Sequence, residues 1–262
     1  TGFLKRSGAT NDIVAARFTF TGEGGSPISI GTTSSVEITS DTAFTLTLSL
    51  SDRGTINSYL NKAGTSSTSG TTYNLSAADD WAAGAHAALD VADTTGNAIT
   101  VTNLPRPTIT SATYSAFSGS LQVTGTDFRR LAGTANDIDV TKLSFVGEGG
   151  ASYTLTSAGV ELASASRFDV TLNATDRAAV NLIMNKSGLT STDGTSYNLV
   201  AAEDWAAGVP SDETVADLTS NPITVSSLFS PAITSATYDA ATGVLVVTGV
   251  NFLQRSGAAN DI

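Results

Sequence analysis

A long internal repeat constrains this chain of 262 residues more than any other feature of its sequence. The segment Asp52–Lys62 recurs as Asp176–Lys186, so the two copies lie 176 − 52 = 124 residues apart. The same offset relates Trp81 to Trp205. A repeat of this length is one structural unit copied along the chain. We therefore expect one fold to occur more than once.

Prolines mark where each unit begins, because proline disfavours the hydrogen bonding of both helices and sheets. Pro105, Pro107 and Pro231 stand at these positions. With unit boundaries at these prolines, the sequence predicts a first unit at 1–104 without its first two strands and a complete unit at 105–230. Residues 231–262 are then the first strands of a third unit. We expect both ends of the chain to cut through a unit.

Within a unit the dominant hydrophobic period is two. Phe168, Val170 and Leu172 alternate with polar residues, which is typical of a half-buried antiparallel strand. Further short strands are expected at Thr108–Tyr114, Ser120–Thr124, Asp139–Val146, Ser152–Thr156 and Ile223–Leu228. About seven short strands separated by turns in one unit predict an all-β fold of the β-sandwich type.

Short helical inserts are expected to interrupt the strands. Ala178–Lys186 has Thr175 as a candidate N-cap and a glycine just past its end, and its counterpart is expected within 51–64. A second short helix is expected at Ala201–Ala207. The glycine cluster Gly147–Gly150 predicts a hairpin turn, because it has neither the spacing nor the lysine of a phosphate-binding loop.

The start of the third unit resembles a known family. Pro231–Tyr238, followed by Gly243–Phe252, is similar to the opening of IPT/TIG-type immunoglobulin-like domains. The whole unit looks like the long repeats of giant bacterial surface and adhesin-like proteins. That resemblance implies tandem immunoglobulin-like β-sandwich repeats with short helical inserts, which form a stalk, fibre or cell-surface coat. It also implies export from the cell and calcium at the junctions between modules.

Calcium is therefore the cofactor to consider, since it binds six to eight oxygen ligands and aspartate is a common donor. The candidate ligands are Asn136, Asp137 and Asp139, with Asn11 and Asp12 as the counterparts in the first copy. The sequence has no EF-hand loop and no glycine-rich nonapeptide repeat. The alternative is that these residues shape turns through hydrogen bonds to the backbone.

Composition narrows the classes of partner and chemistry. With 13 Lys and Arg against 24 Asp and Glu, the net charge of −11 disfavours nucleic acid. The chain has no cysteine and one histidine, which makes thiolate or histidine chemistry improbable. No apolar run is long enough to span a bilayer. We expect an extracellular protein on a bacterial cell surface.

Two sets of residues could carry chemistry or binding, and each has a plainer interpretation. The pairs Asp79-Asp80 and Glu203-Asp204 are sequence neighbours, so they cannot flank one glycosidic bond, and we expect no enzyme activity. The repeated aromatic residues could stack on a sugar ring if they were exposed, but packing on the sandwich is the expected role. They are Trp81, Trp205, Tyr73 and Tyr197.

These observations favour a non-enzymatic structural protein that forms a rod, fibre or surface coat. Its partners would be copies of itself or neighbouring repeats of a longer chain, end to end. Residues 231–262 contain the strands that 1–104 lacks, which suggests strand complementation between molecules in a head-to-tail filament. One continuous giant polypeptide is the alternative to that filament. In the other functional class, the repeats would be an adhesin module that binds glycans or a surface.

Overall fold

The computed structural model describes residues 2–257 and 261, and most of its ordered elements are strands. The strands are β1 (Phe18–Thr21), β2 (Pro27–Ser29), β3 (Ile38–Ser40), β4 (Ala43–Phe44), β5 (Asn74–Ala77), β6 (Thr108–Ser115), β7 (Ser120–Thr126), β8 (Leu143–Val146), β9 (Ser152–Thr154), β10 (Leu162–Ser164), β11 (Arg167–Thr171), β12 (Asn198–Ala201), β13 (Ile223–Ser226), β14 (Ala232–Asp239) and β15 (Val244–Val250). Two α-helices, α1 (Leu50–Tyr59) and α2 (Ala174–Ile183), and short 3-10 turns complete it. The expectation of a mainly-β fold is confirmed.

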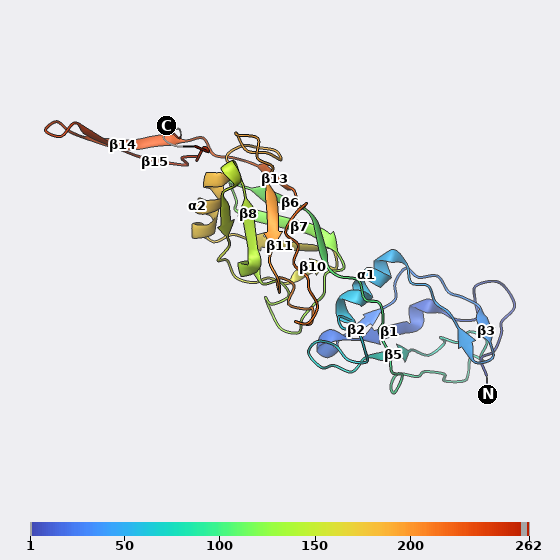
Figure 1. The fold of residues 1–262 in the computed structure, drawn as a ribbon. Helices are drawn as coiled ribbons and strands as arrows, with labels where there is room; N and C mark the ends of the chain where they lie inside the picture. The colour runs from blue at the N-terminus through green and yellow to red at the C-terminus, as the bar shows by residue number, and fades with distance from the viewer. Residues whose placement is uncertain (1, 258–260, 262) are drawn as a thin grey trace.

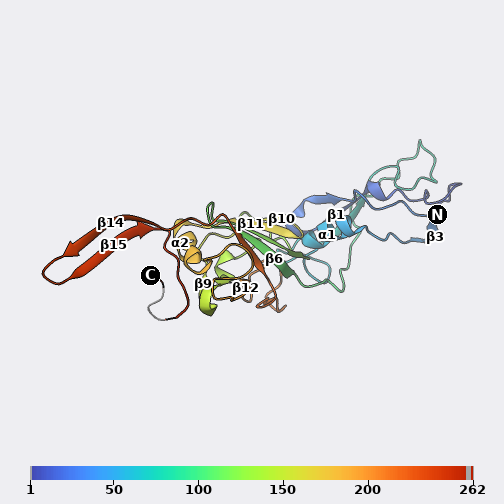
Figure 2. The same ribbon diagram turned by 90° about the horizontal axis from the view of Figure 1, so that it is seen from above.

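The molecule is elongated along the chain direction. The N-terminal residues lie at one end, and the hairpin β14–β15 projects from the opposite end (Figures 1 and 2). Two separate hydrophobic clusters lie between these ends. One cluster is built from buried residues between Ile13 and Ala77, the other from buried residues between Ile109 and Val225. Neither cluster includes a residue of the projecting hairpin.

The second cluster is enclosed by two sheets. One has the strand order β10-β11-β7-β6-β13 and the other the order β12-β8-β9. All neighbours are antiparallel except β13, which pairs in parallel with β6. Tyr114 of β6 packs edge-on against Phe145 of β8, with ring centroids 5.3 Å apart. Side chains from both sheets therefore share one core.

The alternating pattern sets which face of each strand is buried. In β11, Phe168 and Val170 are buried whereas Arg167, Asp169 and Thr171 are exposed. The expected strands are present, except that the one expected at Asp139–Val146 begins only at Leu143, because Val140–Lys142 form a 3-10 turn capped by Asp139. Gly147–Gly150 connects the hairpin β8–β9. Strands β10 and β12 were missed, because Leu-Ala-Ser and Asn-Leu-Val-Ala do not alternate between apolar and polar residues.

The helix predictions need two corrections. Helix α2 begins at Ala174, capped by the Asn173 side chain accepting from the N–H of Asp176, and not at Ala178 after Thr175. The helix expected at Ala201–Ala207 is absent, because β12 ends at Ala201 and Asp204 adopts a left-handed φ of 64°.

A buried carboxylate attaches each helix to a neighbouring loop. Asp176 accepts hydrogen bonds from the backbone N–H and the hydroxyl groups of both Thr156 and Ser157. Burial alone would raise the pKa of Asp176, but these donors outweigh it and lower the pKa. Asp52 of α1 accepts in the same way from residues 31–33. The same contact thus occurs in both copies of the repeat.

The first cluster has fewer strands around it. Its sheets are β2-β1-β5 and the two-stranded β3–β4, and β4 has only two residues. Phe44 and Trp81 are partly exposed, whereas their counterparts Phe168 and Trp205 are fully buried. Nothing among the described residues takes the place that β6 and β7 have in the second unit.

We expect Trp205→Ala to lower the free energy of unfolding of the second unit by about 3–5 kcal/mol, because it empties a fully buried site. Trp81→Ala is the matched control and should cost clearly less, because Trp81 is partly exposed. Denaturant unfolding followed by circular dichroism measures both. Equal losses would contradict the difference in packing between the two units.

Candidate junction between units

A buried glutamate and an asparagine of the first unit hold the backbone of the second. Glu23 follows β1, and Asn61 follows α1. The Asn61 Nδ2 donates to Glu23 Oε2 at 3.0 Å and to the carbonyl oxygen of Arg130 at 2.7 Å. The N–H of Ala132 donates to Glu23 Oε1 at 2.8 Å. Two side chains of one unit thus satisfy the main chain of the next.

The same arrangement recurs one repeat later. Asn185 Nδ2 donates to Glu148 Oε2 at 2.9 Å and to the carbonyl oxygen of Gln254 at 2.6 Å. The N–H of Ser256 donates to Glu148 Oε1 at 2.7 Å. Atom for atom, the bonds match those of the first junction. We call this pair of side chains, Glu23 with Asn61 or Glu148 with Asn185, the Glu-Asn clamp.

A main-chain bond at the end of each helix adds to the clamp. The N–H of Arg130 donates to the carbonyl oxygen of Ser58 at 2.8 Å, and the N–H of Gln254 donates to that of Leu182 at 3.0 Å. The Arg130 guanidinium also lies 5.4 Å from the centre of the Tyr59 ring, a cation–π distance. The last turn of the helix and the clamp therefore contact the same short segment of the next unit.

Glycine positions the glutamate of the clamp. A Cβ atom at Gly147 would lie 2.4 Å from the carbonyl oxygen of Ile183, so only glycine allows the turn to lie against the end of α2. Gly149 has a φ of 65°, which glycine adopts without strain. Between them, Glu148 is only 2% exposed. The repeated Gly-Glu-Gly-Gly sequence is therefore required by this contact as well as by the hairpin.

The clamp glutamates are held ionised. Burial would raise the pKa of Glu148, but donors from Ser256, Asn185 and Thr192 outweigh it and lower the pKa to about 2. The pKa of Glu23 is lowered for the same reason, against its own burial. Since the folded pKa lies below the unfolded one, this stabilisation is complete above the unfolded pKa near 4.5 and is lost as pH falls toward 2.

Arg129 adds further contacts at the first junction. Arg129 is 1% exposed, and its guanidinium donates to Asn61 O, Pro105 O and Glu213 Oε1. The distance to the Glu213 carboxylate is 2.9 Å. The counterpart of Arg129 in the third copy is Leu253, so this ion pair is not repeated. The clamp is the part of the junction that both copies share.

The predicted calcium ligands Asp12 and Asp137 bind the backbone of their own units, and Asp137 lies next to the first junction. Asp137 Oδ1 accepts from the N–H of Leu131 at 2.6 Å, and its Oδ2 accepts from the N–H of Leu162 at 2.8 Å. Asp12 accepts in the same way from the N–H of Arg6. Both aspartates are fully buried, and each closes a loop of its own unit.

The other predicted ligands also contact their own loops. Asp139 Oδ1 accepts from the N–H and hydroxyl of Thr141. Asn11 and Asn136 each donate to a carbonyl oxygen four residues earlier, while their buried Oδ1 atoms accept no hydrogen bond. Within residues 2–257 and 261, no group of three or more His, Cys, Asp or Glu side chains is arranged to hold a metal.

The remaining candidate residues shape loops or fill the core. Glu203 accepts from the N–H groups of Val215 and Ala216, so it is occupied within its own loop. Trp205 is fully buried and donates from Nε1 to the carbonyl oxygen of Val215. Tyr197 is 1% exposed. Their counterparts in the first copy have similar roles. Asp79 accepts from the N–H of Val91, and Tyr73 is buried. Trp81 is partly buried and donates from Nε1 to the Val91 carbonyl oxygen.

The clamp residues were not singled out from the sequence. Glu23 and Glu148 were noted as part of a glycine-rich turn and Asn61 and Asn185 as part of the repeated segment, and the two were not connected with each other. A signal was available, since an acidic residue inside a hairpin turn and an asparagine just past a helix recur together in both copies. Neither feature is needed for the local turn or the helix alone.

We expect Glu23→Gln to loosen the first junction. Both carboxylate oxygens of Glu23 accept hydrogen bonds, so the amide –NH2 group of glutamine would face an N–H donor and leave it without an acceptor. An unsatisfied buried donor costs about 1–3 kcal/mol. Amide hydrogen exchange at Ala132 and Ser69, which both donate to Glu23, should therefore become faster. The control is Asp212→Asn at an exposed position. Unchanged exchange at Ala132 would show that Glu23 does not hold the second unit.

Calcium at Asn136, Asp137, Asp139, Asn11 and Asp12 is one prediction, and turn formation by the same residues is the alternative. Thermal unfolding with and without EDTA distinguishes the two. Calcium that binds only the native state raises Tm by mass action. With the aspartate oxygens already accepting backbone donors, we expect EDTA to leave Tm unchanged. A Tm that falls in EDTA and recovers with added calcium would establish the metal site.

Comparison with protein-family models, with curated proteins and with solved structures gives no match for this chain. In the part of the chain that the structure describes, no helix is long and apolar enough to cross a membrane. The function therefore has to be inferred from the chain's own geometry.

Proposed function

We propose that this chain is a non-enzymatic structural repeat protein of a bacterial surface. In this proposal, immunoglobulin-like β-sandwich units stack end to end into a rod, fibre or coat. The observation that carries it is the Glu-Asn clamp, which occurs twice and each time joins one unit to the main chain of the next. Such a contact has no role inside a single unit, so its repetition supports a function that depends on how units are joined.

The connection between units supports stiffness. The connection between the two units consists of residues 102–107. It runs from Val101, which forms the last β-bridge of the first unit, to Thr108 at the start of β6. This stretch contains Pro105 and Pro107, and Pro105 O accepts from the buried Arg129. A short, proline-containing connection bounded by hydrogen bonds restricts bending much more than a glycine-serine linker does. The clamp and this connection together favour a rod.

The finer fold is part of the proposal. Two sheets that share one core, with a fully buried tryptophan between them, are compatible with an immunoglobulin-like sandwich. The acidic composition and the lack of cysteine favour an extracellular location and keep neighbouring rods apart by charge repulsion.

The structure offers little support for the alternative of a glycan-binding adhesin. Of the four repeated aromatic residues that suggested it, Tyr73, Tyr197 and Trp205 are buried and unavailable for stacking on a sugar. Trp81 is only partly buried, but its ring packs against Phe3, Phe18 and Phe44 and its Nε1 donates to the Val91 carbonyl. Glycan binding would have to use other residues. The structural proposal is therefore the one that the observed contacts favour.

Immunogold electron microscopy of the source bacterium, with antibodies raised against the folded chain, tests the proposal. We expect label on the cell surface or on fibres extending from it, and no binding of the intact chain to a glycan array. Label confined to the cell interior would contradict the proposed location. Specific glycan binding that leaves folding intact would favour the adhesin alternative.

A further inference from the structure

The guanidinium of Arg129 joins three segments that meet at the first junction. Its Nη1 donates to the carbonyl oxygen of Asn61 at 3.2 Å and to Glu213 Oε1 at 2.9 Å, and its Nη2 donates to the carbonyl oxygen of Pro105 at 2.7 Å. Asn61 belongs to the first unit, Pro105 to the connection, and Glu213 to a loop of the second unit. One side chain therefore links both units and the connection between them.

The loop that carries Glu213 lies against the junction. A Cβ atom at Gly208 would lie 2.2 Å from the carbonyl oxygen of Arg129, so this loop approaches the junction backbone as closely as glycine allows. The Thr68 hydroxyl of the first unit donates to the Gly208 carbonyl oxygen at 3.1 Å. The loop is therefore a second place, besides the clamped segment at 130–132, where the first unit contacts the second.

Two separate contacts restrict the orientation of two units more than one contact does. The Glu-Asn clamp holds residues 130–132, and motion of one unit on the other is the usual behaviour where an interface is small. Arg129 holds the connection and the loop at 208–213 on the first unit at the same time. A rotation about the clamp would therefore have to break the hydrogen bonds of Arg129.

Stability alone would not favour an arginine at this position. The side chain of Arg129 is 1% exposed and that of Glu213 is 28% exposed. The Nε atom of Arg129 is buried and has no hydrogen-bond partner within residues 2–257 and 261. An unpaired buried donor is destabilising, and replacing a buried ion pair by apolar residues is often neutral or stabilising. The arginine therefore points to a role in orientation.

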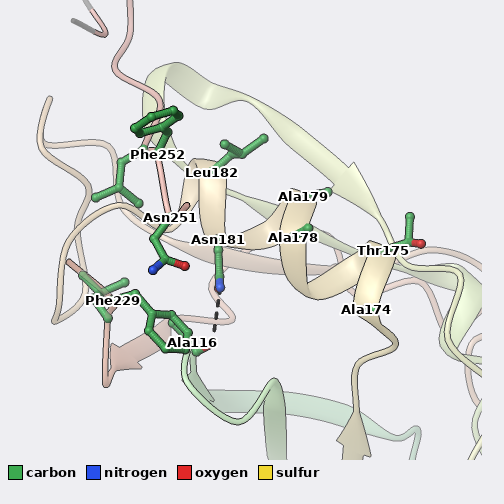
Figure 3. Close-up of a pocket in the computed structure, with 12 residues that line it drawn as sticks. Ala116, Ala174, Thr175, Ala178, Ala179, Asn181, Leu182, Phe229, Asn251 and Phe252 are labelled. Carbon is green, nitrogen blue, oxygen red and sulfur yellow. Dashed lines mark hydrogen bonds between the residues drawn. The ribbon is translucent and has the colours of Figure 1, made fainter. Parts of the chain in front are cut away.

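The other copies of the repeat have an apolar residue where the second copy has Arg129. The counterparts are Leu4 in the first copy and Leu253 in the third. Leu253 follows Phe252, which lies beside Leu182 of α2 (Figure 3). The clamp is thus combined with arginine at one junction and with leucine at the other.

The partner of Arg129 changes in the same way. Trp81 and Trp205 both donate from Nε1 to the carbonyl oxygen ten residues later, so the loops that follow them align without a gap. This alignment places Leu89 of the first copy at the position of Glu213. One copy has leucine at both positions, and the next has an arginine and a glutamate. Arg129 and Glu213 are therefore a matched pair.

We propose that Arg129 is a positioning residue that, together with Glu213, fixes the orientation of the second unit on the first. The clamp joins the units at both junctions, and the Arg129–Glu213 pair adds rigidity at this one. A rod of such units is then stiffer at a junction with the ion pair than at a junction with leucine. This inference rests on the proposed end-to-end stacking and names a residue that sets the stiffness of a junction.

Spin labels at equivalent positions of the two units test the proposal. Ser29 of β2 and Thr154 of β9 are exposed, and both can be changed to cysteine for labelling because the chain has no cysteine of its own. Double electron–electron resonance then measures the width of the distance distribution between the units. We expect a narrow distribution with the native pair and one about twice as wide in Arg129→Leu/Glu213→Leu, because the connection and the loop are released.

The leucine pair separates orientation from stability. It leaves no buried charge, so we expect its denaturation midpoint to stay close to that of the native chain while the distribution widens. Glu213→Leu alone leaves the guanidinium buried without its carboxylate, so it should widen the distribution and also lower the midpoint. The matched control is Arg167→Leu/Asp169→Leu, an exposed ion pair away from the junction, which should leave the width unchanged.

Proteolysis gives a second readout that needs no labels. Because Arg129 binds Pro105 O, the native connection should resist proteinase K. In Arg129→Lys the charge is kept, but one ammonium group cannot donate from the positions of both Nη1 and Nη2. We expect cleavage within 102–104, mapped by mass spectrometry, to be about ten times faster in this variant, because the connection opens locally more often.

Two results would overturn the inference. A distribution as narrow in the leucine pair as in the native chain would show that Arg129 only fills space, and Arg129→Lys decides in the same way if the leucine pair does not fold. Unchanged cleavage of the connection in Arg129→Lys would show that the arginine does not hold it. Neither result affects the proposed function, which the immunogold label tests separately.

Discussion

A buried carboxylate shared between two units is the interaction on which this architecture depends. Glu23 and Glu148 are each 2% exposed, and each accepts its hydrogen bonds partly from its own unit and partly from the next. Burying a charge is costly unless every oxygen has a donor. The glutamate is therefore satisfied only when the neighbouring main chain is in place, so its burial and the orientation of the next unit depend on each other.

Each level of the structure contributes to that contact. Glycine at 147 lets the hairpin turn approach the end of α2, and the N-cap Asn173 with the buried Asp176 fixes where that helix lies. The helix end then presents Asn185, which binds both Glu148 and the carbonyl of Gln254. Local turn chemistry, helix placement and the alignment of units are thus one connected set of hydrogen bonds.

Much of this could be predicted from sequence, and the rest could not for identifiable reasons. The period of two in Phe168, Val170 and Leu172 predicted strand β11, and the repeat predicted that a contact in one copy would recur in the other. The prediction of a helix at 201–207 was wrong because Asp204 has a left-handed φ, and nothing in this alanine-rich segment indicates that conformation from sequence. The clamp joins residues 108 positions apart, Glu148 and Ser256, and no local pattern reports such a pairing.

Residual dipolar couplings of the backbone N–H groups test most directly whether the clamp fixes one unit on the next. If the Glu23-Asn61 clamp aligns the units, a single alignment tensor fits the couplings from both hydrophobic cores of the native chain. Replacing both Glu23 and Asn61 by alanine should then separate the data into two tensors of different magnitude. Two tensors in the native chain, or one unchanged tensor in the double variant, would contradict the account.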